Sequence, residues 1–396
     1  MRAVQVYRNV PRYLAARALS ARLPAVPIAP LRLVETAPPV LPGRGWVRVR
    51  PLLSGICGSD LATVTGHSSF YFSPLVSMPF TPGHEVLGET LDATDALPAG
   101  SRVVLAPVLG CVARGLPPCP ACAAEDTSRC DRVTLGHVSP GLQTGFCADT
   151  GGGWSGELVA HTSQLHAVPP GVSDERAVLT EPLACAVHVA RRAEVAAGER
   201  VLLVGAGAVG LLTLLALRTL TPAGDITVVA KHPRQAELAR RLGASDVVAP
   251  REATRAVRRA AGSVMLSPER GAPYLLGGVD LALDCAGSAA SLDTCLRTTR
   301  AGGRVVLAGI PAPVDLTPVW FRELSLIGAY ATNGADFTTA LELLADERLA
   351  GLRMSLHPLL RWRDAIDEAL SAGRLGVLKV AFDLRYDPAP TLRSTS

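Results

Sequence analysis

The stretch that decides the fold is Val201-Leu-Leu-Val-Gly205-Ala-Gly207-Ala-Val-Gly210, which contains the pattern Gly-x-Gly-x-x-Gly. It follows an apolar strand, and Val209 begins an apolar helix, which is the context expected of a dinucleotide-binding turn. Gly205 permits the tight turn, Gly207 lets the backbone approach a pyrophosphate, and Gly210 allows close packing of helix on strand. The helix N-terminus favours the anion. The alternative is a glycine-rich turn that only packs.

Around this turn, apolar strands alternate with helices rich in Ala and Leu. We expect, in order, a strand at 200–204, a helix at 209–219, a strand at 225–230, a helix at 235–242 and strands at 279–284 and 303–308. This alternation is typical of a doubly wound α/β fold, in which helices cover both faces of a parallel sheet.

The regions on either side have a different character. Residues 1 to about 180 are dense in Pro and Gly and contain short Val-rich stretches, such as 46–50 and 101–105. They predict an all-β region of short strands and irregular loops. The tail predicts helices at 336–344 and 362–371 and a last strand at 377–384. A chain of 396 residues suits two domains.

Composition excludes several classes of protein. Hydrophobic residues make up 48% and charged residues 19%, which indicates a folded chain. The net charge of +4 is spread without a Lys/Arg block, so binding to nucleic acid or a membrane surface has little support. The apolar run 201–217 is short for a bilayer span and contains three glycines. Residues 1–12 lack the apolar core of a signal peptide. We expect a cytoplasmic protein.

The second strand of the α/β region carries a signal about the cofactor. NAD-specific sites have an acidic residue at its end, which binds the ribose hydroxyls. Here the strand runs into Ala230-Lys231-His232-Pro233-Arg234, without an acid. Lys231 and Arg234 stand where a 2′-phosphate would lie, which predicts NADP rather than NAD. The alternative is a basic loop in solvent.

Two short motifs in the first region hold a mixed set of metal donors. They are the stretches Gly55-Ile-Cys57-Gly-Ser59-Asp60 and Gly83-His84-Glu85. Thiolate, imidazole and carboxylate are the ligands of a catalytic zinc that keeps one position open. Glu181, in Thr-Glu-Pro-Leu, is a further carboxylate at the boundary between the two regions.

A second cluster has the pattern Cys111-x7-Cys119-x2-Cys122-x7-Cys130. Four cysteines in a loop with little apolar content indicate a closed structural zinc site with four thiolate ligands. Cys147 could substitute for one of them. The three remaining cysteines lie in apolar contexts and are expected in the core; they are Cys185, Cys285 and Cys295.

With both metal motifs and the Gly-rich turn in this order, the chain resembles the zinc-dependent medium-chain dehydrogenases/reductases. Cys-Gly-Ser-Asp, Gly-His-Glu and Glu-Pro-Leu make it more similar to sorbitol, threonine and glucose dehydrogenases than to liver-type alcohol dehydrogenase. The resemblance extends to Gly287 and Gly309, which follow later Rossmann strands and are expected to contact the cofactor.

The resemblance implies a GroES-like catalytic domain at 1–180, a Rossmann domain at 181–332, and a return to the catalytic domain and a C-terminal tail at 333–396. It also implies an active site in the cleft and homodimers or homotetramers joined through the Rossmann sheets. Cys57, His84 and either Glu85 or Glu181 would hold the catalytic zinc. Zinc would act as a Lewis acid on the substrate oxygen, Ser59 would carry the proton, and NAD(P) would exchange the hydride.

Three features depart from the family pattern. The first gap between structural cysteines is seven residues instead of two, which makes Cys111 the weakest candidate ligand. Ala62 replaces a histidine of the proton relay. The insert His67-Ser-Ser-Phe-Tyr-Phe-Ser-Pro lengthens the segment between the catalytic ligands, and it either lines a substrate pocket or forms a plain surface loop. The alternative role for Ser59 is to cap a helix at 61–64.

The resulting hypothesis is a zinc-dependent oxidoreductase that acts on an alcohol or polyol, or on the matching ketone or aldehyde. One alternative is an NADPH-dependent reductase of C=N or C=C bonds on the same scaffold, for which the missing relay histidine leaves room. A second is a nucleotide-binding protein without enzymatic activity, which the complete set of Cys57, His84 and Glu85 opposes.

Overall fold

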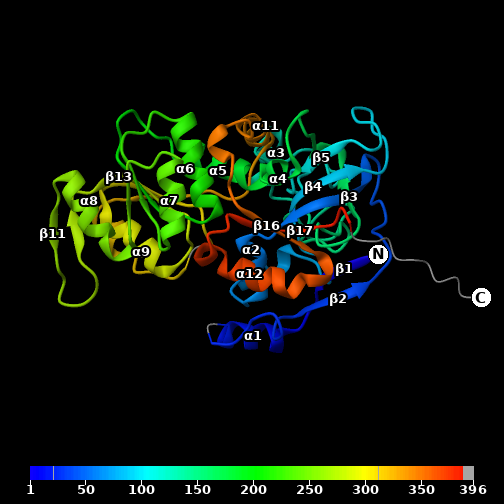
Figure 1. The fold of residues 1–396 in the computed structure, drawn as a ribbon, viewed down its shortest axis with the longest axis horizontal. Coiled ribbons are helices and arrows are strands. Elements are labelled where there is room, and N and C mark those ends of the chain that lie inside the picture. Colours follow the sequence, from blue (N-terminus) through cyan, green and yellow to red (C-terminus); the bar gives the residue numbers. More distant parts are fainter. Residues whose placement is uncertain (21, 311, 387–396) are drawn as a thin grey trace, which may run out of the picture. The chain divides into compact units, whose positions relative to one another are not determined.

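The computed structural model describes residues 1–20, 22–310 and 312–386. The described residues form two compact units (Figure 1), the first from residues 1–181, 332–372 and 379–386, the second from residues 182–331 and 373–378. The predicted domain bounds, 180/181 and 332/333, lie one residue from two of these divisions. Residues 387–396 of the predicted tail lie outside the described residues.

The first unit is built on a seven-stranded sheet with the order β16-β17-β3-β4-β5-β7, in which β6 also pairs with β3. All pairs are antiparallel except β16 and β17. The strands are β3 (Trp46–Gly55), β4 (Glu85–Thr90), β5 (Arg102–Leu105), β6 (Leu158–His161), β7 (Leu165–Ala167), β16 (Met354–Pro358) and β17 (Lys379–Asp383). The predicted strands at 46–50 and 101–105 are therefore confirmed.

One face of this sheet packs against a core, and the alternation of buried apolar and exposed polar side chains in β3 shows how. In the first half of β3, buried valines alternate with exposed arginines, because successive side chains of a strand point to opposite faces. Val47 and Val49 pack with Val86, Val103 and neighbouring apolar residues in one buried cluster. Two further strands, β1 (Arg2–Val6) and β2 (Leu31–Glu35), form a separate antiparallel pair.

The prediction that residues 1–180 are all β is wrong, chiefly at helix α1 (Val10–Leu19). The side chain of Asn9 accepts a hydrogen bond from the backbone N–H of Arg12 at 3.0 Å, which caps the helix. Pro11 fits the first turn because its missing N–H would have had no helical partner there. The remaining helices of this region are α2 (Gly58–Val64), α3 (Pro120–Ala123), α4 (Asp174–Ala177) and the start of α5 (Thr180–Arg192).

The second unit contains a six-stranded parallel sheet with the order β10-β9-β8-β13-β14-β15. The strands are β8 (Val201–Val204), β9 (Ile226–Val229), β10 (Asp246–Val248), β13 (Val279–Asp284), β14 (Thr299–Leu307) and β15 (Ser325–Gly328). In chain order this is the arrangement 3-2-1-4-5-6 of a doubly wound dinucleotide-binding fold. The predicted α/β fold class is confirmed.

Helices connect these strands, which Figure 1 shows in green and yellow. They are α6 (Ala208–Leu220), α7 (Pro233–Arg241), α8 (Ala253–Ala261), α9 (Ala289–Thr298) and α10 (Thr317–Phe321). Every residue of β8 and β9 is buried, as expected for central strands covered on both faces. The hairpin of β11 (Val264–Leu266) and β12 (Tyr274–Leu276) was not predicted.

Two tail helices belong wholly or partly to the first unit, α11 (Gly334–Leu343) and α12 (Trp362–Leu375). Both were predicted, at 336–344 and 362–371, and the predicted last strand is β17. Among the helices of the described residues, none combines the length and apolar character that a membrane-spanning segment needs.

Candidate metal centres and cofactor turn

Three strands of the first unit bring the mixed donor set together. Strand β3 ends at Gly55, two residues before Cys57, and β4 begins at Glu85. The register pairs Gly55 with Glu85 on one side and with Ala381 of β17 on the other. Because β17 begins at Lys379, this lysine lies at the same end of the sheet.

Asp60 holds the loop that carries Cys57. Cys57 is the N-cap of α2, and its backbone N–H donates to a carboxylate oxygen of Asp60 at 2.9 Å. The other oxygen, Oδ1, lies 3.6 Å from Nδ1 of His84. Asp60 and His84 are both buried, and this carboxylate holds the Cys57 loop by a hydrogen bond and lies close to His84 without forming one.

The donor atoms of Cys57, His84 and Glu85 all lie within 4.8 Å of one another. Glu85 is 1% exposed, and its Oε2 is buried without a hydrogen-bond partner among the described residues. A Cβ atom added at Gly55 would lie 1.9 Å from this oxygen, so only glycine leaves room for the carboxylate. A buried, unpartnered carboxylate oxygen beside a thiol and an imidazole fits a divalent cation.

A buried ammonium group balances part of this charge. Nζ of Lys379, which is 5% exposed, contacts Oε1 of Glu85 at 2.5 Å and the carbonyl oxygen of Ile56 at 3.4 Å. Burial opposes the charged form, but Glu85 and Cys57 raise the pKa of Lys379. Burial likewise opposes protonation of His84, while Asp60 and Cys57 raise its pKa well above the usual range. The cluster therefore favours positive charge at its centre.

Glu181 and Ser59 occupy different positions from these donors. Glu181 is buried in the first turn of α5 and acts electrostatically on His84 and Lys379. Within the described part of the chain, it is not in the group of converging donor atoms. Ser59 lies inside α2, whose N-cap is Cys57, so the alternative that Ser59 caps a helix at 61–64 is wrong.

The four cysteines of the second cluster also converge. All four Sγ atoms, including that of Cys111, lie within 4.8 Å of one another. The Cys111–Cys130 distance between Sγ atoms is 3.7 Å, and the Cys119–Cys130 distance is 4.0 Å. Four sulfurs at Zn–S bonds of about 2.3 Å in a tetrahedron are about 3.8 Å apart. The spacing therefore fits zinc, whereas a disulfide would need sulfurs about 2 Å apart.

Backbone N–H groups point at these sulfurs. Cys119 N donates to Sγ of Cys111 at 3.4 Å, and Arg132 N donates to Sγ of Cys130 at 3.5 Å. Backbone N–H groups of Cys122 and Asp131 lower the pKa of Cys119 to about 7. Such hydrogen bonds stabilise thiolates, which are the form that binds metal.

The other cysteines are separate from both clusters. All nine cysteines are free thiols. Cys147 is buried and its thiol donates to the carbonyl oxygen of Ser139 at 3.5 Å, outside the four-sulfur group. Burial raises the pKa of Cys285 to about 12, and Cys295 is fully buried in the core of the second unit.

The glycines of the predicted cofactor turn meet the requirements of close packing. Gly205 has φ of +109°, and a Cβ at Gly210 would lie 1.8 Å from the carbonyl oxygen of Gly205. A Cβ at Gly309 would lie 2.6 Å from the backbone nitrogen of Gly287, so the loops after β13 and β14 touch. In contrast, a Cβ at Gly207 would meet nothing within 4 Å. That open backbone at the start of α6, one residue before Ala208 and two before Val209, suits a phosphate.

The end of β9 has the predicted lack of acid. Ala230 is buried and its N–H donates to the carbonyl oxygen of Val248 at 3.0 Å. Lys231 and Arg234 are exposed at the start of α7. The stem of Arg234 packs against Gly376, where an added Cβ would lie 2.1 Å from Cδ of the arginine.

The insert after α2 is attached to two helices of the first unit. The hydroxyl of Tyr13 donates to the carbonyl oxygen of Ser68 at 2.5 Å, and Oγ1 of Thr63 lies 3.1 Å from Oγ of Ser68. Phe70 and Tyr71, in a short 3₁₀ helix at Phe70–Leu75, are exposed. Whether the insert lines a substrate pocket stays a prediction.

Sequence reasoning missed two residues of the mixed cluster and one of the cysteine lobe. Asp60 was visible in the Cys-Gly-Ser-Asp motif but received no role. Lys379 had only a weak signal, as a charged residue at the start of a strand whose middle is apolar and whose last residue is Asp383. Arg114 gave no signal, because nothing in the sequence distinguishes it from an exposed loop arginine.

Comparison with known proteins identifies both units. A model of the "Alcohol dehydrogenase GroES-like domain" matches residues 43–170, and one of the "Zinc-binding dehydrogenase" family matches residues 208–346. The chain is 28% identical to an L-idonate 5-dehydrogenase of Vitis vinifera, over 89% of this chain and 93% of that one. It is 30% identical to a "probable zinc-binding alcohol dehydrogenase" of Mycobacterium tuberculosis, over 80% of this chain and 76% of that one.

Among solved structures, an alcohol dehydrogenase of the archaeon Aeropyrum pernix has a TM-score of 0.75 at 22% identity, covering 97% of this chain and 100% of that one. These relatives exclude the non-enzymatic alternative and favour alcohol chemistry over reduction of C=N or C=C bonds. The chain belongs, as its motifs predicted, to the zinc-dependent medium-chain dehydrogenases, and it is an oxidoreductase of alcohols or polyols that uses zinc and a nicotinamide cofactor.

Proposed function

We propose that Cys57, His84 and Glu85 hold the catalytic zinc and that Cys111, Cys119, Cys122 and Cys130 hold a structural zinc. The observation that carries the first assignment is the convergence of three donor atoms within 4.8 Å, with Glu85 Oε2 left without a hydrogen-bond partner in the described part of the chain. The resemblance left Glu85 and Glu181 as alternatives. The structure favours Glu85, and Glu181 adds negative charge from α5.

Zinc, when bound, supplies a Lewis acid for the oxygen of an alcohol or carbonyl substrate. Asp60 holds the Cys57 loop and places a carboxylate oxygen beside His84, and Lys379 holds one oxygen of Glu85. Ser59, two residues after Cys57 in the first turn of α2, is the hydroxyl that would carry the substrate proton. The cofactor that takes the hydride would be positioned by the Gly-rich turn and the two later loops, namely Gly205, Gly207, Val209, Gly210, Gly287 and Gly309.

The two glutamates provide a direct test. Glu85→Gln should release the catalytic metal, because an amide oxygen without charge is a poorer zinc ligand. Glu181→Gln should keep the metal and change only the rate. Zinc content of the two purified variants, with turnover measured on a panel of alcohols and polyols, separates the assignments. Metal loss in Glu181→Gln and not in Glu85→Gln would show that the ligand is Glu181.

The preferred cofactor is NADP in this proposal. Two exposed cations follow Ala230, where an acid would repel the 2′-phosphate. A hydrogen bond to a charged group contributes about 1.5–3 kcal/mol, and exposure reduces this. Two discounted contacts still give about tenfold preference, since about 1.4 kcal/mol corresponds to tenfold.

Exchange of the charges tests the cofactor proposal. Ala230→Asp combined with Lys231→Gln and Arg234→Gln should reverse the preference towards NAD. The measurement is kcat/KM for both cofactors in the wild type and the triple variant. A wild type that prefers NAD by tenfold or more would contradict it and would mean that the basic loop only faces solvent.

The proposal includes a homodimer or homotetramer joined through the Rossmann sheet. Strand β15 is the last strand of the six-stranded order, and its Leu326 is exposed. Trp320 of α10 is 82% exposed and Phe321 is also exposed. A strand edge beside large apolar side chains is a template for pairing with a second copy. Light scattering should find a dimer or larger, and Trp320→Glu should weaken it; a monomeric wild type would contradict this.

The substrate is a small alcohol, ketone or polyol, with no nucleic acid or membrane as partner. Nine free thiols suit a reducing compartment, so we place the enzyme in the cytoplasm.

A further inference from the structure

The seven-residue gap after Cys111 contains a buried arginine. Arg114 is 0% exposed, although arginine is almost never fully buried unless it is paired. Its backbone N–H donates to the carbonyl oxygens of Gly110 at 3.2 Å and Cys111 at 3.1 Å. The side chain of Arg114, three residues after the first cysteine of the cluster, is therefore buried.

Its guanidinium ties together the two ends of the cysteine lobe. Nε donates to the carbonyl oxygen of Leu109 at 3.0 Å, ahead of the cluster. The Nη atoms donate to carbonyl oxygens behind the cluster, namely Leu135 at 2.9 Å, Val138 at 3.1 Å, Ser139 at 3.4 and 3.5 Å, and Gly141 at 2.6 Å. One side chain thus fixes residues that precede Cys111 and residues that follow Cys130.

The backbone around Arg114 is built for this burial. The N–H of His137 donates to the carbonyl oxygen of Arg114 at 3.2 Å. Gly136 has φ of +90°, and a Cβ there would lie 2.3 Å from the same oxygen. Any other residue at 136 would push the returning segment away from the arginine.

The charge of Arg114 needs a counter-charge. Every hydrogen bond that the structure gives its guanidinium goes to a carbonyl oxygen, which carries no net charge, and a buried cation without compensation is costly. Burial lowers the pKa of Arg114, whereas the thiols of Cys147, Cys130 and Cys111 and the carboxylate of Asp149 favour its charged form. Two of these belong to the four-cysteine cluster, and zinc with four thiolates carries a net charge of about −2.

We propose that Arg114 is the positioning residue of the four-cysteine metal site: its guanidinium joins the backbone before Cys111 to the backbone after Cys130 and so holds the two ends of the cysteine lobe together. The proposal rests on the structural zinc proposed above.

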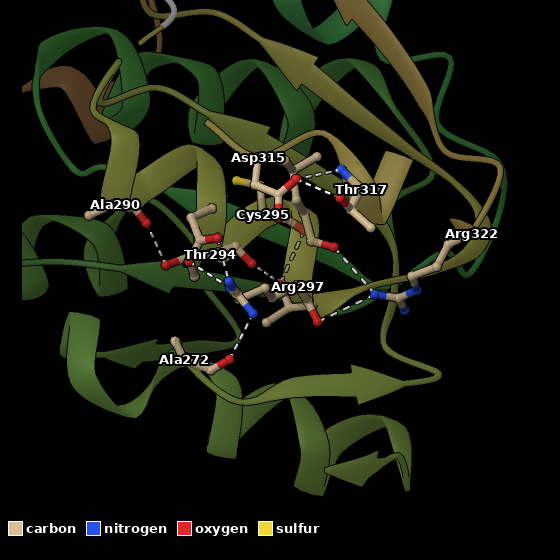
Figure 2. A network of polar contacts seen from close by, with 11 residues as sticks. Ala272, Ala290, Thr294, Cys295, Arg297, Asp315, Thr317 and Arg322 are labelled. Carbon is tan, nitrogen blue, oxygen red and sulfur yellow. Dashed lines mark hydrogen bonds and ion pairs between the residues drawn. The ribbon is translucent and has the colours of Figure 1, made fainter. Parts of the chain in front are cut away.

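A second buried arginine provides a matched control. Arg322, in the second unit, is 5% exposed and also donates to carbonyl oxygens. These are Leu296 at 3.3 Å, Arg297 at 3.5 Å and Gly277 at 2.9 Å, and Figure 2 shows Arg322 beside this network. No four-cysteine group accompanies it in the described residues. Arg322 therefore separates general stability from an effect on metal.

The experiment compares full-length Arg114→Met, Arg114→Lys and Arg322→Met with the wild type. Affinity at the cysteine lobe is measured by letting the protein compete with a chromophoric chelator for zinc. Substitution of Co²⁺ for zinc reports thiolate coordination through the charge-transfer band of the Co²⁺ site. Arg114→Met should weaken metal binding at the lobe by about 10–100-fold, the usual effect of removing an outer-shell partner. Arg114→Lys keeps the positive charge but lacks the forked guanidinium, so its metal affinity should lie between those of the wild type and Arg114→Met.

Arg322→Met should lower the melting temperature while metal affinity at the lobe stays within about twofold of wild type. Equal affinity in wild type and Arg114→Met, or equal weakening in Arg322→Met, overturns the proposal. If Arg114→Met does not fold, Arg114→Lys decides: wild-type affinity in it, after loss of the fork, contradicts the positioning role. A wild type whose lobe binds neither Zn²⁺ nor Co²⁺ overturns the structural zinc itself, which is a different result.

Discussion

The two donor clusters of the first unit differ in how their charges are arranged. The cysteine lobe has four identical donors on loops and short helical turns, with backbone N–H groups pointing at the sulfurs and a buried arginine outside the ligand set. The mixed cluster has three different donors at strand ends, with Asp60 and Lys379 buried directly against them. The first arrangement suits a site that is closed by protein ligands alone, and the second suits a site with a position left for substrate.

The difference shows that donor identity alone does not define a metal site. Around the cysteines, backbone N–H groups point at the sulfurs, and Arg114 joins the backbone on either side of the cluster. Around Cys57, His84 and Glu85, neighbouring side chains contact individual donor groups. One carboxylate oxygen of Glu85 accepts from Lys379, and the other has no hydrogen-bond partner among the described residues. Perturbing each cluster should therefore change different properties.

The largest expected effect is that of Cys57→Ala on turnover. Loss of a catalytic zinc ligand should lower kcat/KM by at least about 10³-fold, or about 4 kcal/mol of transition-state stabilisation. The fold should remain, because Cys57 is only the N-cap of a short helix. Steady-state kinetics and circular dichroism melting are the measurements. An active variant would mean that the mixed cluster does not serve catalysis.

Cys119→Ser should have the converse effect. A closed zinc site contributes to folding free energy, so loss of one thiolate should lower stability by about 3 kcal/mol. For a unit of this size that lowers the melting temperature by about 6–12 °C. If Cys119→Ser abolishes turnover without loss of stability and Cys57→Ala does the opposite, the two sites have been exchanged.

Lys379→Met tests the buried pair in the mixed cluster. Removing one partner leaves the Glu85 carboxylate uncompensated, and broken buried pairs cost about 3–5 kcal/mol. Bound zinc should offset part of this, so the loss should be larger in metal-free protein. Chemical denaturation with and without zinc measures both values. A double variant with Glu85→Gln should recover stability; equal losses with and without zinc would contradict the role of Lys379 in balancing this cluster.

The smallest effect concerns a methyl group. Gly55→Ala places Cβ where Oε2 of Glu85 lies and should weaken zinc binding at the mixed site by about tenfold, or about 1.4 kcal/mol. Gly58→Ala, at the first position of α2, meets nothing within 4 Å and serves as the control. Chelator competition on both variants is the assay. Equal affinities would show that Glu85 does not need its present position.

Sequence reasoning was most successful where local pattern determines structure. Strand β13 was predicted with its observed bounds, Val279–Asp284, because its apolar segment Leu281–Leu283 lies between glycines and polar residues and is buried in the sheet. The Gly-rich turn and both donor sets were also visible, since their spacing is short. Helix α1 was missed because Pro and Arg at its start obscured the cap at Asn9.

Contacts between distant residues could not be predicted. Lys379 is 294 positions from Glu85, and only the register of β17 on β3 brings it to the mixed cluster. The guanidinium of Arg114 donates to the carbonyl oxygen of Gly141, 27 positions further along the chain. The segment between them is mostly irregular, so no periodicity predicts that Arg114 is buried. Both are charged side chains, which a sequence alone places at the surface because burial of charge requires partners that the pattern does not show.

Stepwise removal of metal tests the two-site account most directly. Purified protein is treated with increasing chelator, and released zinc, turnover and melting temperature are measured on the same samples. We predict about two zinc ions per chain, with turnover lost as the first is released from the mixed site, where the protein supplies three donors, and the melting temperature falling as the second leaves the four-cysteine lobe. One zinc or fewer under metal-replete conditions, or turnover that survives complete removal, would contradict the account.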